Sequence, residues 1–166
     1  MASGKVMIFM GDGYGKSAAA FGIALKRASE NDRVVIIQFL KGKGIMESEF
    51  TKRLEPEIKI FRFEKSKIDY RDRSKEEQEE ASENIRNGLA FARKVLGTGQ
   101  CNLLVLDEVL EVVNLGIISV DDLGELVEAG MDTDIIITGK EMDIGVCKFA
   151  DRISEIVNMQ FKKYEY

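Results

Sequence analysis

The sequence predicts an α/β fold with a mainly parallel sheet and helices on both faces. Apolar runs rich in β-branched residues alternate with segments of helical periodicity. The runs are almost continuously apolar, which is typical of parallel strands buried on both faces. A glycine-rich stretch follows the first run directly, where open α/β sheets bind ligands.

The first half of the chain contains the clearest strand signals. VMIFM at residues 6–10 ends in glycines and predicts a buried strand, followed by a helix over 17–28. VVIIQFL at 34–40 predicts a second buried strand. IKIFRF at 58–63 alternates, so one face of this third strand should be wetter.

The second half begins with a capped helix. Ser74 and Glu77 form an S-x-x-E capping box, and Gly97 is the expected C-cap. Four apolar residues share one face of this helix: Ile85, Leu89, Ala92 and Leu96. The remaining predictions are a strand at 103–106, a helix from Ser119 to Gly130, a strand at 135–137, a helix near 142–150 and a strand near 152–157.

Composition restricts the kind of protein. The 166 residues are 45% hydrophobic and 32% charged, which fits a single globular domain over residues 1–166. The net charge of −5 disfavours a broad nucleic-acid or anionic-membrane surface. No apolar run approaches the roughly 20 residues of a membrane span. The N-terminus lacks a signal pattern, so we expect a cytoplasmic protein.

The chain contains no histidine. This excludes Ser-His-Asp and Cys-His nucleophile systems and the usual histidine-bearing zinc sites. A hard metal held by carboxylate, hydroxyl and phosphate oxygens remains possible. Cys101 and Cys147 lie far apart in the sequence and are expected to be reduced structural thiols.

The stretch MGDGYGKS at residues 10–17 nearly matches the phosphate-loop pattern G-x-x-x-x-G-K-[ST]. Its first glycine comes one residue late, at Gly11. Backbone N–H groups and the helix dipole would attract an anion here, and glycines at 11, 13 and 15 would let phosphate approach. Lys16 could contact a phosphate and Ser17 could bind Mg²⁺. The alternative is a glycine-rich turn that binds nothing, but the strand, helix and later acidic pair favour nucleotide binding.

Asp107 and Glu108 end the LLVL strand opposite this loop, where carboxylates typically hold Mg²⁺. The alternative is a helix N-cap followed by an acid in the first turn. Lys140 could reach an anion or be a solvated turn lysine. The loop with Lys41 and Glu47 is either flexible or a lid, and residues 64–73 are expected to be a solvated connector. We expect residues 11–17, 41, 107–108 and 138–140 to converge at the carboxyl edge of the sheet.

Several of these motifs resemble those of the ATP:corrinoid (cob(I)alamin) adenosyltransferases. The family's phosphate loop looks like T-G-x-G-K-G-K-T-T-A-A-F-G, with the same late first glycine, and residues 10–22 read MGDGYGKSAAAFG. Residues 38–42 (QFLKG), Glu47, residues 106–108 (LDE) and residues 137–140 (ITGK) match further motifs in the same order. The resemblance covers residues 4 to 157.

The resemblance implies a RecA-like phosphate-loop NTPase fold and a homodimer. It also implies transfer of the 5′-deoxyadenosyl group of ATP to the cobalt of a reduced corrinoid such as cobalamin, releasing triphosphate, in cobalamin biosynthesis or salvage. Co(I) would be the nucleophile, so no general base is required. The site residues it implies fall into three groups. The triphosphate cradle is Gly11, Asp12, Gly13, Tyr14, Gly15, Lys16, Ser17 and Ala18; the Mg²⁺ site is Ser17, Glu108 and Asp107; and Lys26, Lys41, Glu47 and Lys140 lie near the nucleotide.

The chain also departs from the family pattern. Tyr14 replaces a lysine, Ser17-Ala18 replaces a threonine pair, and the family's lid tryptophan is absent, with Ile68 or Tyr70 as substitutes. The short NMQFKKYEY replaces the longer family tail, so these departures affect the corrinoid side most. Two other hypotheses stay open: a phosphate-loop ATPase or kinase, and a relative that binds ATP with weak or no catalysis.

Overall fold

A six-stranded sheet forms the centre of the computed structural model, which describes residues 4–40, 45, 47–64, 66–130 and 132–159. The strand order is β3-β2-β4-β5-β1-β6, and each of the five neighbouring pairs is parallel. The strands are β1 (Val6–Met10), β2 (Val34–Phe39), β3 (Ile58–Phe63), β4 (Leu103–Asp107), β5 (Asp134–Thr138) and β6 (Arg152–Glu155). All six predicted strands are confirmed, with ends shifted by at most two residues.

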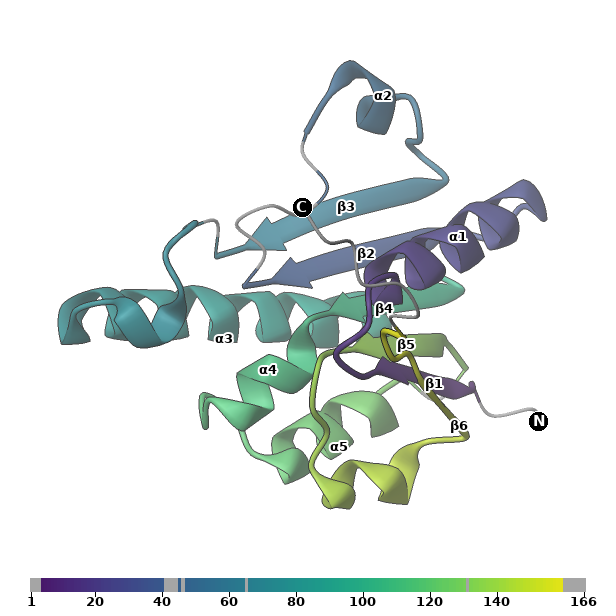
Figure 1. The fold of residues 1–166 in the computed structure, drawn as a ribbon. Helices are drawn as coiled ribbons and strands as arrows, with labels where there is room; N and C mark the ends of the chain where they lie inside the picture. The colour runs from purple at the N-terminus through teal and green to yellow at the C-terminus, as the bar shows by residue number, and fades with distance from the viewer. Residues whose placement is uncertain (1–3, 41–44, 46, 65, 131, 160–166) are drawn as a thin grey trace, which may run out of the picture.

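Helices cover both faces of this sheet, as predicted (Figure 1). The helix α1 (Lys16–Ser29) packs on one face, while α3 (Lys75–Gly97), α4 (Val109–Asn114) and α5 (Val120–Glu128) lie on the other. Strand residues alternate between the two layers. In β4, Leu103 and Val105 pack with the α1 layer, whereas Leu104 and Leu106 pack with the opposite layer.

The two predicted capping boxes are present at Ser74 and Ser119. Hydrogen bonds from the Ser74 backbone and side chain hold the pKa of Glu77 below its ordinary value. The expected cap at Gly97 is wrong, because α3 includes Gly97 and has Thr98 as its C-cap. The Thr98 hydroxyl donates to the Lys94 carbonyl at 2.8 Å, and the left-handed turn occurs later, at Gly99 with φ 60°.

The remaining differences concern short elements. The helix expected near 142–150 is a 3₁₀ helix, η2 (Ile144–Phe149). Two further elements, α2 (Glu49–Lys52) and the 3₁₀ helix η1 (Tyr70–Asp72), have no counterpart among the predicted elements. Each of the three begins with a side chain, from Ser48, Asp69 or Asp143, that accepts a backbone N–H. Helical segments of three to six residues are too short to show a hydrophobic period.

Among the described residues, no helix is both long enough and apolar enough to cross a membrane.

Both cysteines are free thiols, as expected. Cys101 is buried, and this burial raises the pKa of its thiol to about 11. Cys147 is exposed.

Candidate functional site

The carboxyl ends of four strands meet around one buried carboxylate, Asp107 at the end of β4. Its Oδ1 accepts hydrogen bonds from the Ser17 hydroxyl at 2.8 Å and from the Thr138 hydroxyl at 2.7 Å. Its Oδ2 accepts the Gln38 side-chain amide at 3.1 Å. Asp107 is only 2% exposed, so these three donors take the place of water around a buried charge. The expected convergence of residues 17, 107 and 138 is therefore confirmed.

Gln38 follows from the sheet register rather than from a local motif. It lies directly opposite Asp107 in the β2–β4 pair and is itself 2% exposed. Its Nε2 donates to Asp107, but its Oε1 is buried without a hydrogen-bond partner among the described residues. A buried amide oxygen of this kind requires a donor, such as a water or a ligand group, for full stabilisation. The QFLKG motif does not indicate a role for Gln38, because its partner Asp107 depends on the register of the β2–β4 pair.

Glu108 lies where the chain turns from β4 into α4. Its backbone is left-handed, with φ 67°, and its N–H donates to the Thr138 hydroxyl at 2.9 Å. Glu108 occupies the N-cap position of α4, but its side chain makes no capping hydrogen bond. The alternative of a helix N-cap is therefore met in position only, because the Glu108 carboxylate does not cap the helix. A left-handed glutamate costs about 1–3 kcal/mol, and such backbone strain is concentrated at functional sites.

The phosphate loop connects β1 to α1. Gly15 is left-handed, with φ 109°, and turns the chain so that α1 begins at Lys16. The Ala18 N–H lies in the first turn of α1, which has no preceding helical carbonyls to accept it. The Lys16 ammonium folds back on the Gly13 carbonyl at 2.9 Å. A positive side chain and a helix N-terminus therefore lie together at the edge of the sheet, an arrangement that attracts anions.

The first two glycines of the loop have a different role from the one we expected. The Gly11 N–H donates to the Lys140 carbonyl at 2.9 Å, and the Gly13 N–H donates to the Ile156 carbonyl at 2.8 Å. A Cβ atom at either glycine would lie within 2.6 Å of the Ile156 carbonyl oxygen. The lack of a Cβ atom at these two glycines lets the Ile156 backbone pack against the loop. Our expectation that the loop N–H groups attract an anion is wrong for these two, because both are bound to backbone carbonyls.

Other predicted residues are dispersed. Lys140 lies beside the loop, because its carbonyl binds Gly11. Lys26 lies in the last turn of α1, about 15 Å along the helix axis from Lys16 at 1.5 Å per residue, so the structure does not bring it to the loop. Its neighbour Arg27 is bound by Asp32 and Asp134.

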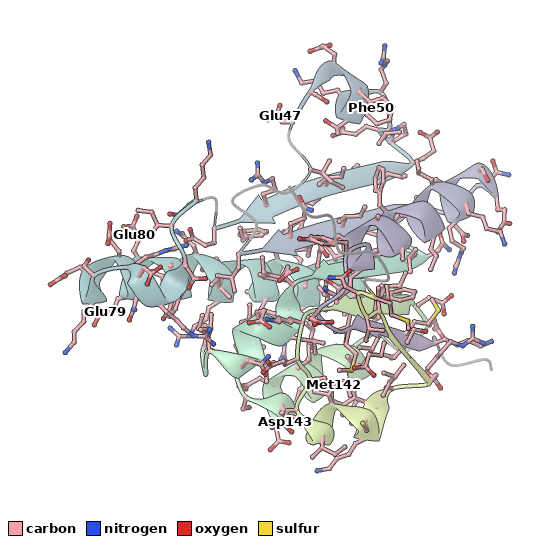
Figure 2. The ribbon with its side chains drawn as sticks, viewed as in Figure 1. Glu47, Phe50, Glu79, Glu80, Met142 and Asp143 are labelled. Carbon is pink, nitrogen blue, oxygen red and sulfur yellow. The ribbon has the colours of Figure 1, made fainter. Side chains whose placement is uncertain are left out.

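Glu47 is exposed beside α2, beyond the edge strand β3 (Figure 2). Lys41 lies outside the described residues.

A cleft of about 410 Å³ opens next to the acidic pair. Its lining includes Glu108, Lys140, Ile68 and Tyr70. The wall formed by residues 66–71 and 73 is held by more contacts than the solvated connector that we expected over residues 64–73. Arg73 pairs with Glu64 at 2.9 Å, with side chains only 5% and 7% exposed.

The same segment is fixed at two further points. Arg73 donates to the Ile68 carbonyl at 3.0 and 2.8 Å. The Tyr70 hydroxyl is 2.8 Å from the Ser82 hydroxyl of α3. The wall of the cleft is therefore held to α3, while Ile68 remains 54% exposed.

The donor set at the acidic pair fits a hard divalent cation. It offers the Ser17 hydroxyl, the Asp107 carboxylate and the nearby Glu108 carboxylate, which are oxygen ligands that Mg²⁺ accepts. Within the described ranges, no group of three or more histidine, cysteine, aspartate or glutamate side chains could hold a metal. A cation here would therefore need phosphate and water oxygens as well, which is usual for Mg²⁺ bound with a nucleotide.

Comparison with known proteins agrees with this geometry. The family model for ATP:corrinoid adenosyltransferase BtuR/CobO/CobP matches residues 2–165. A corrinoid adenosyltransferase of Escherichia coli K12 is 25% identical over 154 residues, which cover 92% of this chain and 76% of the relative. The corrinoid adenosyltransferase CobA of Salmonella typhimurium is 25% identical over 155 residues, with the same shares.

A solved structure confirms the predicted RecA-like phosphate-loop fold. The KaiC-like protein of Pyrococcus horikoshii superposes with a TM-score of 0.53 over 88% of this chain and 67% of that one. Its sequence identity of 19% bears on the fold alone. The family match, in contrast, spans nearly the whole sequence. The chain therefore belongs to the ATP:corrinoid adenosyltransferase family.

Proposed function

We propose that this protein transfers the 5′-deoxyadenosyl group of ATP to the cobalt of a reduced corrinoid and releases triphosphate, in cobalamin biosynthesis or salvage. The observation that carries the proposal is the Ser17–Asp107–Thr138 hydrogen-bond network directly below the N-terminus of α1. It joins a candidate phosphate site to a candidate cation site. The family match supports ATP and a corrinoid as the substrates.

The chemistry requires little acid–base catalysis from the protein. The Co(I) electron pair forms a bond to the ribose C5′. The C5′–O bond breaks at the same time, and triphosphate leaves with the electron pair of that broken bond. A chain without histidine can support this step, because no proton has to be removed from the nucleophile. The protein must stabilise the negative charge that develops on the leaving group.

Two parts of the site are suited to this stabilisation. Lys16 can exchange its contact with the Gly13 carbonyl for a phosphate oxygen, and the first-turn N–H groups of α1 add hydrogen bonds. Ser17, Glu108 and Asp107 would hold Mg²⁺, which supplies further positive charge to the triphosphate when bound. The buried donors Gln38 and Thr138 fix the orientation of Asp107 for this role.

The cleft beside Glu108 is the proposed corrinoid side of the site. Its 410 Å³ volume is within the usual range for small-molecule pockets, although a whole corrinoid would extend beyond it. Ile68 and Tyr70 provide apolar surface in the place of the missing family tryptophan. Arg73 and Glu64 hold this wall in place.

The experiment compares wild type, Lys16→Ala and Lys26→Ala with MgATP and chemically reduced cobalamin. Lys26→Ala is the matched control, because it removes a lysine from the opposite end of the same helix. Wild type and Lys26→Ala should form a Co–C bond and release triphosphate, whereas Lys16→Ala should lose at least 100-fold in turnover, about 2.7 kcal/mol or more of transition-state stabilisation.

Other products would identify another function. Orthophosphate release without a change in the cobalt spectrum would indicate an ATPase or kinase. Binding of MgATP without turnover would indicate a non-catalytic relative. We further propose that the protein is a cytoplasmic homodimer. Light scattering of the purified protein measures its mass and so tests for the dimer.

A further inference from the structure

A segment after β6 contacts the phosphate loop from outside the nucleotide motif. The Ile156 N–H donates to the Met10 carbonyl and the Ile156 carbonyl accepts the Gly13 N–H, both at 2.8 Å. The chain leaving β6 thus pairs with both ends of the turn that leaves β1. The close fit of Gly11 and Gly13 against the Ile156 carbonyl belongs to the same contact.

Two residues further on, Asn158 uses both ends of its side-chain amide on this loop. Its Oδ1 accepts the Tyr14 N–H at 3.2 Å, and its Nδ2 donates to the Asp12 carbonyl at 3.3 Å. One side chain therefore fixes the two peptide groups that flank Gly13. The Lys16 ammonium also contacts this turn, at the Gly13 carbonyl, so Asn158 is the side chain that holds it from outside the loop.

These contacts divide the loop into two parts. The N–H groups of Gly11, Gly13 and Tyr14 are bound to Lys140, Ile156 and Asn158. The loop therefore offers an anion chiefly the first turn of α1 and Lys16, which lie after the left-handed turn at Gly15. The direction of that turn depends on the peptide groups directly before it, which are the ones that Asn158 holds.

We infer that Asn158 is a positioning residue for triphosphate binding: it fixes residues 12–14 so that the N-terminus of α1 and Lys16 face the phosphates. Asn158 acts through the loop and does not touch the substrate. The inference rests on the proposed function, because it takes the phosphate loop as the triphosphate site. It adds Asn158 and the Ile156 backbone to that site, although no nucleotide-binding motif extends there.

The test measures inorganic triphosphate and MgATP binding by calorimetry for wild type, Asn158→Ala, Asn158→Gln and Val157→Ala. Val157 is the matched control, because its side chain is 54% exposed and makes no hydrogen bond to the loop. Loss of two exposed hydrogen bonds should weaken binding of both ligands by about three- to tenfold in Asn158→Ala. Asn158→Gln should recover part of this loss, and Val157→Ala should bind like wild type.

Two further measurements separate positioning from a general loss of stability. Amide exchange by NMR should be faster at Tyr14 in Asn158→Ala, with unchanged exchange in β4 and an unchanged melting temperature. In the transfer assay, kcat/KM for ATP should fall three- to tenfold, because a displaced loop weakens the contacts of Lys16 and the first turn of α1 with the triphosphate.

Each failure has its own signature. If wild type binds neither triphosphate nor MgATP, the proposed function and this inference are both overturned. If wild type binds both ligands and Asn158→Ala binds them with equal affinity, the inference is overturned and the proposed function stands. Unchanged Tyr14 exchange in Asn158→Ala, or an equal loss of binding in Val157→Ala, would also overturn the inference.

Discussion

Replacing Thr138 by valine tests the buried network at the centre of the site. Valine keeps the branched shape of threonine at a position with 0% exposure, so packing should change little. The change removes the hydroxyl that donates to Asp107 at 2.7 Å and accepts the Glu108 N–H at 2.9 Å. A hydrogen bond to a charged group contributes about 1.5–3 kcal/mol. The Glu108 N–H is only partly buried, so the loss of its acceptor costs about 1 kcal/mol more, the low end of the range for a buried donor.

We therefore expect Thr138→Val to lower the free energy of unfolding by about 3 kcal/mol, and the melting temperature by roughly 6–12 °C. The chain offers a matched control in Thr133, a second buried threonine near the opposite end of β5. Its hydroxyl makes one long hydrogen bond, 3.3 Å to the Cys101 carbonyl, so Thr133→Val should cost about 1 kcal/mol or less. Urea unfolding of both variants measures the difference, and equal losses would refute the idea that the Asp107 network is a special source of stability.

Two further predictions concern stability away from the site. Gly88→Ala should destabilise the protein by about 1–3 kcal/mol, because the added Cβ would lie 2.7 Å from the Phe63 ring. Gly97→Ala lies on the same helix but in open space, so it should stabilise the protein by about 0.5–1 kcal/mol. Thermal unfolding that ranks the two variants the other way would contradict the packing at Gly88. Burial works to raise the pKa of Asp134, but hydrogen bonds from the Lys5 N–H and Arg27 outweigh it and hold that pKa below its ordinary value. The folded pKa is below the unfolded one, so this stabilisation is complete above about pH 4 and is lost as the pH falls further. Asp134→Asn should accordingly be less stable than wild type at pH 7, with a gap that narrows below pH 4, and a gap independent of pH would count against the Arg27 contact.

The sequence predicted the parts of the molecule that repeat a local physical pattern. Runs such as VVIIQFL identify strands because burial on both faces requires continuous apolarity. The approach of Ser17 to Asp107 could be predicted because ligand groups in open α/β sheets gather at the carboxyl ends of the strands.

The contributions of Gln38 and Asn158 could not be predicted in this way. The partner of Gln38 depends on the register of two strands separated by α3, and no local pattern fixes that register. Asn158 is an exposed polar residue after the last strand, so neither burial nor periodicity distinguishes it from an ordinary loop residue. The contact of Gly11 and Gly13 with the Ile156 carbonyl could not be predicted for the same reason, since a glycine-rich turn does not reveal which neighbour approaches it.

The strand order has a consequence for how the molecule is made. The strand β1 is synthesised first, yet its neighbours in the sheet are β5 and β6, the last two strands of the chain. Its pairing therefore closes loops of more than a hundred residues, and contacts of such high sequence separation form slowly. During translation, the segment that contains the phosphate loop must remain without its strand partners until most of the chain has left the ribosome. The site that we propose for triphosphate is therefore among the last parts of the protein to form.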